Sequence, residues 1–225
     1  MDEWIPPAIR DSKIFMYPFY WYAYKGKNLK SVMSFKANAY KMTDQEFGDF
    51  YTQRDTRFSN SRPTDLSQPC IDYMFDHIEK DSKTLLDVGC ASGYFLKQAR
   101  QKGYETTGCD VITGITFEHS DYVQANVEKL PFDDDSFDVV TCSHTLEHVI
   151  DFQESIKELK RVAKKQLIVV VPCQRAYFYT LDEHLRFFPY KGLLEQEMKM
   201  KHFECEKIWG DLVFIGDVEK EKQEG

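Results

Sequence analysis

The sequence predicts an α/β protein with a doubly wound, mostly parallel sheet that ends in an antiparallel hairpin and follows an aromatic-rich helical extension. From Lys83 onward, apolar strand-like runs alternate with segments of helical periodicity, the order expected of a parallel sheet covered by helices on both faces. The last two strand-like runs flank Gly210, as in an antiparallel pair. The first 60 residues hold 14 of the 33 Phe, Trp and Tyr residues of the chain, which sets them apart from the sheet.

Each element has its own signal. The expected strands cover residues 84–88, 105–110, 122–124, 137–143 and 166–171, followed by the pair 202–209 and 211–215. The expected helices cover residues 44–51, 64–80, 93–102 and 145–164, and the first of them opens on the capping box Thr43-Asp44-Gln45-Glu46. Residues 111–120 are short and contain Thr113-Gly114, so we expect no full helix there.

We divide the chain into an N-terminal arm, residues 1–63, and a main domain, residues 64–225. The arm has a net charge of +3 and the main domain −11. A protein that grips nucleic acid needs a basic face, so the acidic main domain argues against a nucleic-acid partner. We expect the arm to pack its rings on the main domain or on a second copy in a homodimer, and a packed arm can also act as a lid.

The composition also indicates the cellular compartment of the protein. No apolar run approaches the roughly 18 residues of a membrane span, and the acidic start Met1-Asp2-Glu3 does not resemble a signal peptide. The six cysteines are scattered without a CxxC pair, which favours buried thiols over disulfides. We therefore expect a cytoplasmic protein.

A small-residue loop, Gly89-Cys90-Ala91-Ser92-Gly93, follows the first strand of the sheet. Ligands of open parallel sheets bind at the carboxyl ends of the strands, and a residue without a Cβ lets the backbone approach a ligand closely. A dinucleotide loop requires G-x-G-x-x-G, but the second and third of these positions are Ala91 and Tyr94. Nicotinamide and flavin cofactors are therefore disfavoured, and a tight turn without a ligand is the alternative.

Two further positions indicate a nucleoside. Asp110 stands 21 residues after Gly89 at the end of the second strand, where a carboxylate can accept hydrogen bonds from both ribose hydroxyls. Asn126 can hydrogen-bond an adenine edge while Val127 covers its face. The run Asp133–Asp135 is expected to be a solvated turn rather than a metal site.

Four motifs together resemble the class I, Rossmann-like S-adenosylmethionine (SAM) dependent methyltransferases. They are LLDVGCASGYF at 85–95, Asp110, NVEKLPFDDDSFDVV at 126–140 and SHTLEHV at 143–149. The resemblance is to small bacterial enzymes related to ubiquinone-biosynthesis O-methyltransferases and to polysaccharide-associated methyltransferases. It implies that SAM is the cofactor, with Asp87 and the glycine loop near its methionine part. This chain departs from the family at Ala91, where a glycine is usual, and at Asn126, where an aspartate is usual.

Upstream segments add to the resemblance. Tyr51-Thr52-Gln53-Arg54 and Arg62-Pro63-Thr64 are similar to the family segment that folds over SAM, and a guanidinium such as Arg62 can hold the SAM carboxylate in two parallel hydrogen bonds. The residues expected to bind the cofactor are Tyr51, Arg62, Asp87, Gly89, Cys90, Ala91, Gly93, Asp110, Val111, Asn126, Val127 and Ser143.

The candidate catalytic residues are three histidines, His144, His148 and His184, with Glu147 between the first two. The spacing of residues 144, 147 and 148 predicts one helix face beside the methyl group. One hypothesis makes His148 or His184 a general base. In another, all four residues bind a divalent metal, as the E-x-x-E-H motif of some relatives implies, although this chain reads H-T-L-E-H. The third is a purely structural role.

The leading functional hypothesis is a methyltransferase of a small polar acceptor. An oxygen of a sugar or polysaccharide precursor is suggested by residues 182–189, which resemble segments of polysaccharide-associated relatives. Two alternatives remain. One is a catalytically silent SAM-binding partner subunit that uses the aromatic arm as its interaction surface. The other is a transferase that moves a different group of SAM on the same scaffold.

Overall fold

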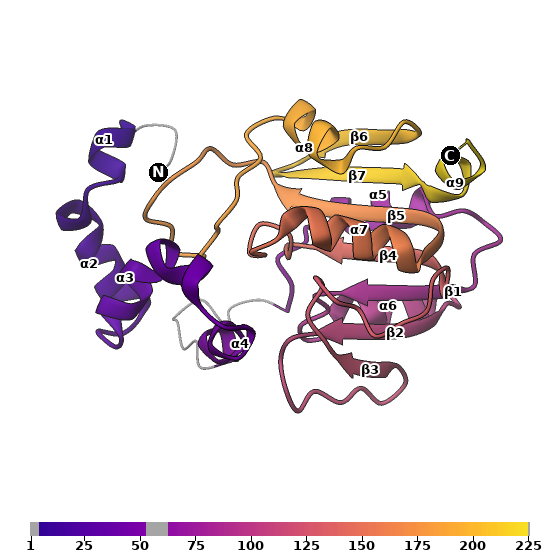
Figure 1. Ribbon diagram of the computed structural model, residues 1–225, viewed down its shortest axis with the longest axis horizontal. Helices are drawn as coiled ribbons and strands as arrows, with labels where there is room; N and C mark the ends of the chain where they lie inside the picture. The colour runs from indigo at the N-terminus through magenta and orange to yellow at the C-terminus, as the bar shows by residue number, and fades with distance from the viewer. Residues whose placement is uncertain (1–4, 53–62, 225) are drawn as a thin grey trace.

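A seven-stranded sheet forms the centre of the molecule (Figure 1). The computed structural model describes residues 5–52 and 63–224. The strands are β1 (Thr84–Val88), β2 (Glu105–Asp110), β3 (Asp121–Gln124), β4 (Phe137–Ser143), β5 (Ala163–Pro172), β6 (Phe203–Ile208) and β7 (Asp211–Asp217). Their spatial order is β3-β2-β1-β4-β5-β7-β6; the first five are parallel, and β7 runs antiparallel to both of its neighbours. The predicted fold class is confirmed.

Helices cover both faces of this sheet. One apolar core contains residues of α5 (Gln68–Asp76) and α6 (Tyr94–Gln101), and the other contains residues of α7 (Phe152–Val162) and α8 (Lys191–Met198). The central strands lie between these cores, and residues 167–171 of β5 are fully buried, which explains their continuous apolar run. A last helix, α9 (Val218–Glu224), follows β7.

Most predicted elements are confirmed, but two helices are shorter than expected. The helix expected over residues 64–80 is α5, whose first turn is capped by the Ser67 hydroxyl, 3.3 Å from the amide nitrogen of Cys70. The helix expected over residues 145–164 is α7, which begins only at Phe152. As expected, residues 111–120 contain no helix.

The late start of α7 has a local cause. His144 has a left-handed backbone (φ 50°), and the amide of His148 donates to the carbonyl of Thr145 at 2.9 Å, so the chain turns before it becomes helical. The Asp151 carboxylate then accepts from the amide of Glu154 at 3.0 Å and caps the helix. At the other end, strand β5 takes over directly at Ala163.

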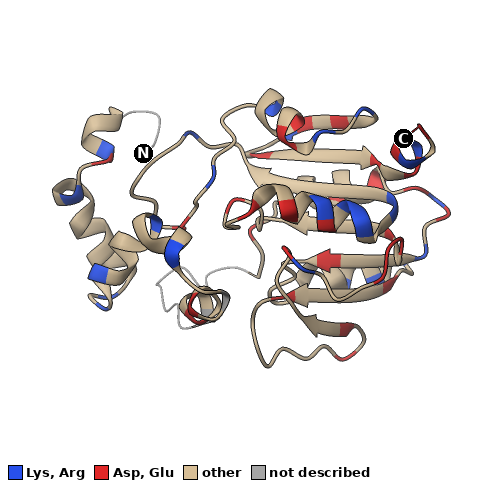
Figure 2. Cartoon of the chain, in the orientation of Figure 1, with Lys and Arg blue, Asp and Glu red and all other residues tan. Residues whose placement is uncertain are grey.

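The described part of the arm forms a helical unit beside the sheet. It contains α1 (Pro7–Arg10), α2 (Lys13–Ala23), α3 (Leu29–Asn38), the 3₁₀ turn η1 (Ala39–Lys41) and α4 (Asp44–Thr52). The predicted capping box is present: the Thr43 amide donates to a Glu46 carboxylate oxygen at 2.8 Å, and the Glu46 amide donates to the Thr43 hydroxyl at 3.3 Å. Lys and Arg residues occur along α1–α3, whereas acidic residues are frequent on the sheet domain (Figure 2).

The arm is bonded to the loop between β5 and α8, residues 173–190, called here the β5–α8 loop. This loop reaches out from the sheet and lies beside the arm helices (Figure 1). Arg10 donates to the carbonyl of Tyr179 at 2.6 Å, and the hydroxyl of Tyr20 donates to the carbonyl of Thr180 at 2.5 Å. The rings of the arm therefore pack inside this chain, on its own β5–α8 loop. Over the described ranges, no helix is both long and apolar enough to cross a bilayer.

Candidate active site

A cavity of about 660 Å³ lies between α4 and the loops at the carboxyl ends of β1, β2 and β4. This is the edge where open parallel sheets bind ligands. The residues of the sequence prediction that line it are Tyr51, Gly89, Ala91, Asp110, Val111, Asn126, Val127, His144 and His148. Its volume is in the range of small-molecule sites. Arg62 lies outside the described residues.

The other predicted site residues do not line this cavity. Cys90, a buried thiol, packs in the core with α5 and α6, and Gly93 starts α6. Ser143 ends β4, and Glu147 and His184 lie behind the cavity wall. Asp87 is buried, with its carboxylate accepting from the Thr141 hydroxyl at 2.7 Å, and burial raises its pKa to about 7.

Glycine is required at position 89 both by the backbone conformation and by the lack of room for a Cβ atom. Its φ is 78°, in the left-handed region, and its amide donates to the carbonyl of Cys109 at 2.7 Å. A Cβ at this position would overlap the hydroxyl of Thr145 and lie 2.9 Å from the Thr145 Cβ. The chain of β1 can thus turn against the segment after β4 only with glycine here.

Asp110 joins the glycine loop to the end of β2. One carboxylate oxygen accepts from the amide of Ala91 at 2.9 Å, and the other accepts from the amide of Ile112 at 3.2 Å. Burial raises the pKa of this carboxyl, and the amide donors work against that rise. A carboxylate oxygen has two acceptor sites, so each can also receive a hydroxyl from the cavity.

The segment after β3 borders the cavity on its other side. Val127 is buried in the wall, and the side-chain oxygen of Asn126 accepts from the amide of Glu128 at 3.0 Å, which forms a tight turn. The Glu128 carboxylate in turn accepts from the amides of Ile150 and Asp151 at 3.1 and 2.9 Å. Glu128 therefore fixes this segment against the turn that follows β4.

The predicted helix face for residues 144–148 is wrong, because these residues form the turn before α7. The turn nevertheless brings His144 and Glu147 together: Nδ1 of His144 lies 3.5 Å from Oε1 of Glu147, and Nε2 lies 3.5 Å from Asp211 on β7. Burial lowers the pKa of His144, but the two carboxylates raise it more, to about 10. The two carboxylates thus favour the protonated form of His144.

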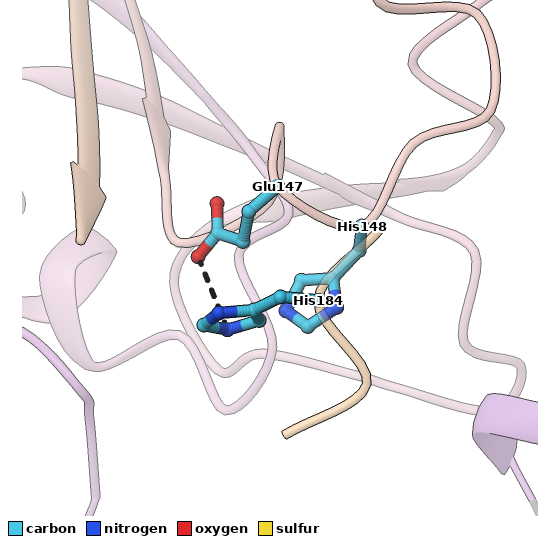
Figure 3. A group of neighbouring side chains, drawn as sticks. All are labelled: Glu147, His148 and His184. Carbon is cyan, nitrogen blue, oxygen red and sulfur yellow. Dashed lines mark ion pairs between the residues drawn. The ribbon is translucent and has the colours of Figure 1, made fainter. Parts of the chain in front are cut away.

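Glu147 is the buried anion of this group. Its side chain has no exposed surface. Burial acts to raise the pKa of Glu147, but the neighbouring histidines lower it by a larger amount, so that the pKa is about 2. Nε2 of His184 lies 3.8 Å from the same Oε1 (Figure 3). Neither carboxylate oxygen accepts a hydrogen bond from any residue in the described ranges.

His148 and His184 lie side by side (Figure 3). Their ring centroids are 4.8 Å apart at an interplanar angle of 75°. The hydroxyl of Tyr51 lies 3.1 Å from Nδ1 of His148, and Nδ1 of His184 lies 2.8 Å from the side-chain oxygen of Gln174. Donor atoms of Glu147, His148 and His184 all lie within 4.8 Å of one another. These three residues, without His144, match the donor chemistry of a divalent transition metal.

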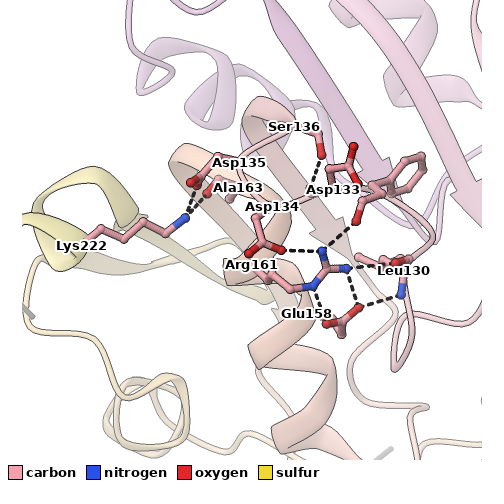
Figure 4. Close-up of polar contacts among 10 residues, drawn as sticks. Leu130, Asp133, Asp134, Asp135, Ser136, Glu158, Arg161, Ala163 and Lys222 are labelled. Atoms are coloured by element: carbon pink, nitrogen blue, oxygen red, sulfur yellow. Dashed lines mark hydrogen bonds and ion pairs between the residues drawn. The ribbon is translucent and has the colours of Figure 1, made fainter.

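The acidic run before β4 forms a turn held by basic partners (Figure 4). Arg161 of α7 bonds Asp134 at 2.9 Å, Glu158 at 2.7 Å and the carbonyl of Leu130 at 3.0 Å. Lys222 pairs with Asp135. The expected turn is present, and its Asp134 and Asp135 are about half or more exposed but also tied to α7 and α9, which fixes the segment between β3 and β4 in place.

Several cavity residues were missed by the sequence interpretation. Gln45, Phe47 and Asp49 of α4 line the cavity, as does Asp65 before α5. Their sequence carries no ligand motif, and only the fold brings α4 across the open edge of the sheet. Thr145 also lines it, and its place in SHTLEHV was an available signal.

Comparison with known proteins agrees with this geometry. Residues 86–171 match the family model described as a methyltransferase domain. The chain is 28% identical over 140 residues to a ubiquinone biosynthesis O-methyltransferase of Coxiella burnetii, covering 57% of each. It is 35% identical over 104 residues to a 2-phytyl-1,4-naphtoquinone methyltransferase of Trichormus variabilis, covering 38% of this chain and 44% of that protein. The chain thus spans about half the length of these curated relatives.

A solved structure extends the likeness to the fold. A SAM-dependent methyltransferase from Aquifex aeolicus superposes with a TM-score of 0.54 at 15% identity, covering 66% of this chain and 89% of that one. At that identity, the likeness concerns the fold. The β1 loop, the Asp110 carboxylate and the cavity beside them fit SAM, which this fold implies as its cofactor. Residues 86–171 are thus similar to a methyltransferase domain, and the fold of the chain is similar to that of a SAM-dependent methyltransferase of known structure.

Proposed function

We propose that this protein transfers a methyl group from SAM to a hydroxyl oxygen of a small polar acceptor. One observation carries the proposal: His148 lines the same cavity as Gly89 and Asp110. A group that can take up a proton therefore borders the same space as the residues proposed to hold the cofactor. The curated relatives support the reaction class, since both are named as methyltransferases and one as an O-methyltransferase.

The cofactor half of the site is proposed to act by positioning. Asp110 would receive the ribose hydroxyls, while Asn126 and Val127 would hold the adenine. When bound, SAM supplies a methyl group made electrophilic by the positive sulfur. Alignment of the acceptor with that methyl is then the main requirement of the reaction, and the fixed turn around Gly89 provides a rigid wall for it.

On the acceptor side we assign the general base to His148. Its imidazole would take the hydroxyl proton as the acceptor oxygen forms its bond to the methyl carbon and the bond from that carbon to the sulfur breaks, which would leave SAM as the neutral demethylated thioether. His144 lies between the carboxylates of Glu147 and Asp211, which favour its protonated form, so we assign it a positioning role with Glu147. His184 packs against the His148 ring and would fix its orientation.

The acceptor itself is proposed from the cavity and from the sequence. The histidine-bearing wall suits a hydroxyl compound, and the resemblance of residues 182–189 to polysaccharide-associated enzymes favours a sugar or polysaccharide precursor. The absence of a CxxC pair from the sequence supports a cytoplasmic location.

Turnover of SAM with a panel of hydroxyl acceptors, including nucleotide sugars and phenols, tests this function by product mass. We expect a gain of one methyl group on one acceptor class, and loss of at least 100-fold in kcat for His148→Ala with SAM affinity retained. His119→Ala, an exposed histidine far from the cavity, is the matched control. SAM binding without turnover on any acceptor would instead favour the silent partner subunit, and a product carrying another group would favour the alternative transferase.

The metal hypothesis has a separate test, since the triad of Glu147, His148 and His184 has fitting donors. Native mass spectrometry of the purified chain would detect a bound divalent ion, and exhaustive chelation would abolish turnover if the ion polarises the acceptor oxygen. Full activity after chelation, with no ion detected, would leave His148 as the base acting without a metal.

A further inference from the structure

Helix α2 of the arm is apolar on both sides, but residues 5–52 and 63–224 cover only one of them. Met16, Tyr20 and Ala23 face inward and are buried. Ile14 and Trp21, at helical spacing on the opposite side, are 88% and 54% exposed. A helix that is apolar all round is normally covered all round, and this outer surface is therefore expected to meet an apolar environment.

The surroundings of this surface are positively charged (Figure 2). Residues 5–43 contain seven Lys and Arg and one acid, Asp11, in a chain whose net charge is −8. The Asp11 carboxylate accepts from the amide of Phe178 at 2.6 Å and so faces the β5–α8 loop. The exposed basic side chains around α2 and α3 are Lys13, Lys25, Lys27, Lys30 and Lys41.

We propose that this surface, the outer side of α2 with its surrounding lysines, docks on an anionic lipid bilayer. Interfacial helices insert Trp, Tyr and aliphatic side chains between headgroups while Lys and Arg pair with anionic lipids. Tyr17 and Trp21 have the amphipathic rings that favour the interface, and Ile14 supplies the most exposed apolar side chain of the arm. The helix would lie in the plane of the headgroups rather than span the membrane.

The observations favour lipid over the other occupants. A two-fold dimer through α2 would bring the same patch onto itself, so the lysines of one copy would face those of the other. A single-stranded nucleic acid would match the charge, but it uses aromatic platforms for stacking, whereas the outermost residue here is aliphatic Ile14. An anionic bilayer satisfies the apolar surface and the charge together.

The contacts on the inner side of the arm indicate which part of the protein docking would bring to the membrane. The β5–α8 loop is bonded to the arm helices through Arg10 and Tyr20 and carries His184. Docking would thus bring the loop that carries His184 close to the bilayer. The surface proposal does not depend on the proposed reaction, because it rests on the arm alone.

Co-sedimentation of the full chain with vesicles tests the proposal. We expect binding to phosphatidylcholine vesicles containing about one third phosphatidylserine, at least tenfold weaker binding to phosphatidylcholine alone, and loss of binding at high salt. The double variant Ile14→Ser/Trp21→Ser is expected to weaken binding at least tenfold. Trp209→Ser is the matched control, because Trp209 is 76% exposed and belongs to the β6–β7 turn rather than to the arm.

Calorimetry of SAM binding to each variant separates loss of the surface from loss of the fold. Equal vesicle binding by the double variant and the parent would overturn the proposal, as would no binding to either vesicle. A dimer in light scattering that the double variant abolishes would assign the surface to a second copy, and preference for a single-stranded RNA over vesicles would assign it to nucleic acid. Failure of the parent protein to bind SAM would count against the proposed function and leave the surface proposal standing.

Discussion

The hydroxyl of Tyr51 lies 3.1 Å from Nδ1 of His148, although 97 residues separate them. Tyr51 belongs to α4 of the arm, and His148 to the turn after β4. Their rings also meet edge to face, with centroids 5.6 Å apart. The arm therefore contributes a side chain to the wall that carries the proposed base, and its role extends beyond packing.

Tyr51→Phe removes this hydrogen bond while keeping the ring. A hydrogen bond of this kind contributes about 0.5–1.5 kcal/mol, so we expect kcat to fall by roughly 3–10-fold while the Kd of SAM changes less. Steady-state kinetics with calorimetry of SAM binding would measure both. Tyr40→Phe, on a tyrosine that is 60% exposed, serves as control. An unchanged kcat in Tyr51→Phe would show that the contact does not orient His148.

Gly89→Ala is expected to weaken SAM binding by more than tenfold, because its Cβ would displace Thr145 at the cavity wall. Gly103→Ala offers a matched comparison: Gly103 also has a left-handed backbone (φ 98°), but no neighbour lies within 4 Å of an added Cβ. Both variants should lose some stability, whereas only Gly89→Ala should lose SAM affinity. Comparable affinity in the two would refute the steric argument.

Ala91→Gly is expected to stabilise the protein. Ala91 has φ 43°, and an L-residue with a Cβ in this region costs about 1–2 kcal/mol. Glycine removes that cost but makes the unfolded chain more flexible, which offsets about 0.4–1 kcal/mol of the gain. We therefore expect a gain of about 0.5–1 kcal/mol in the free energy of unfolding, measured with urea. Ala37→Gly, at an exposed position within α3, should show the opposite sign. A loss in both variants would mean that the left-handed turn stores no strain.

Asp87→Asn is expected to change how stability depends on pH in the SAM-free protein. Burial raises the folded pKa of Asp87 to about 7, against about 3.8 unfolded, so the folded state holds the proton more tightly. The parent should lose stability from this group as pH rises from about 4 to 7, by at most about 1.4 kcal/mol per pH unit, and then level off. The asparagine variant has no such proton. The difference between them, followed by thermal unfolding, should therefore grow across that window. A constant difference would show that Asp87 titrates normally.

The parts predicted best from sequence are those governed by strand periodicity and by strand ends. Gly89 and Asp110 terminate adjacent parallel strands, so the topology alone brings them to one cavity edge. The start of the helix predicted over residues 145–164 was wrong, because the apolar periodicity continues through the turn before α7. Asp151 and Glu154 form the capping pattern that marks the true start of the helix. The placement of α4 over the cavity depends on contacts with the β5–α8 loop, which is distant in the sequence, so no local sequence pattern predicts it.

The bonds from Arg10 and Tyr20 connect the arm to the β5–α8 loop, which carries His184, and the ring of His184 lies against that of His148 at the cavity. Lipid binding by the arm and acceptor binding in the cavity can both favour the same conformation of this loop. In that case each must strengthen the other by the same factor, since thermodynamic coupling is reciprocal. If lipid orders this loop, then an acceptor in the cavity raises the affinity for the bilayer by the same factor by which the bilayer raises the affinity for the acceptor. The protein would then reside longest on a membrane where its acceptor is present.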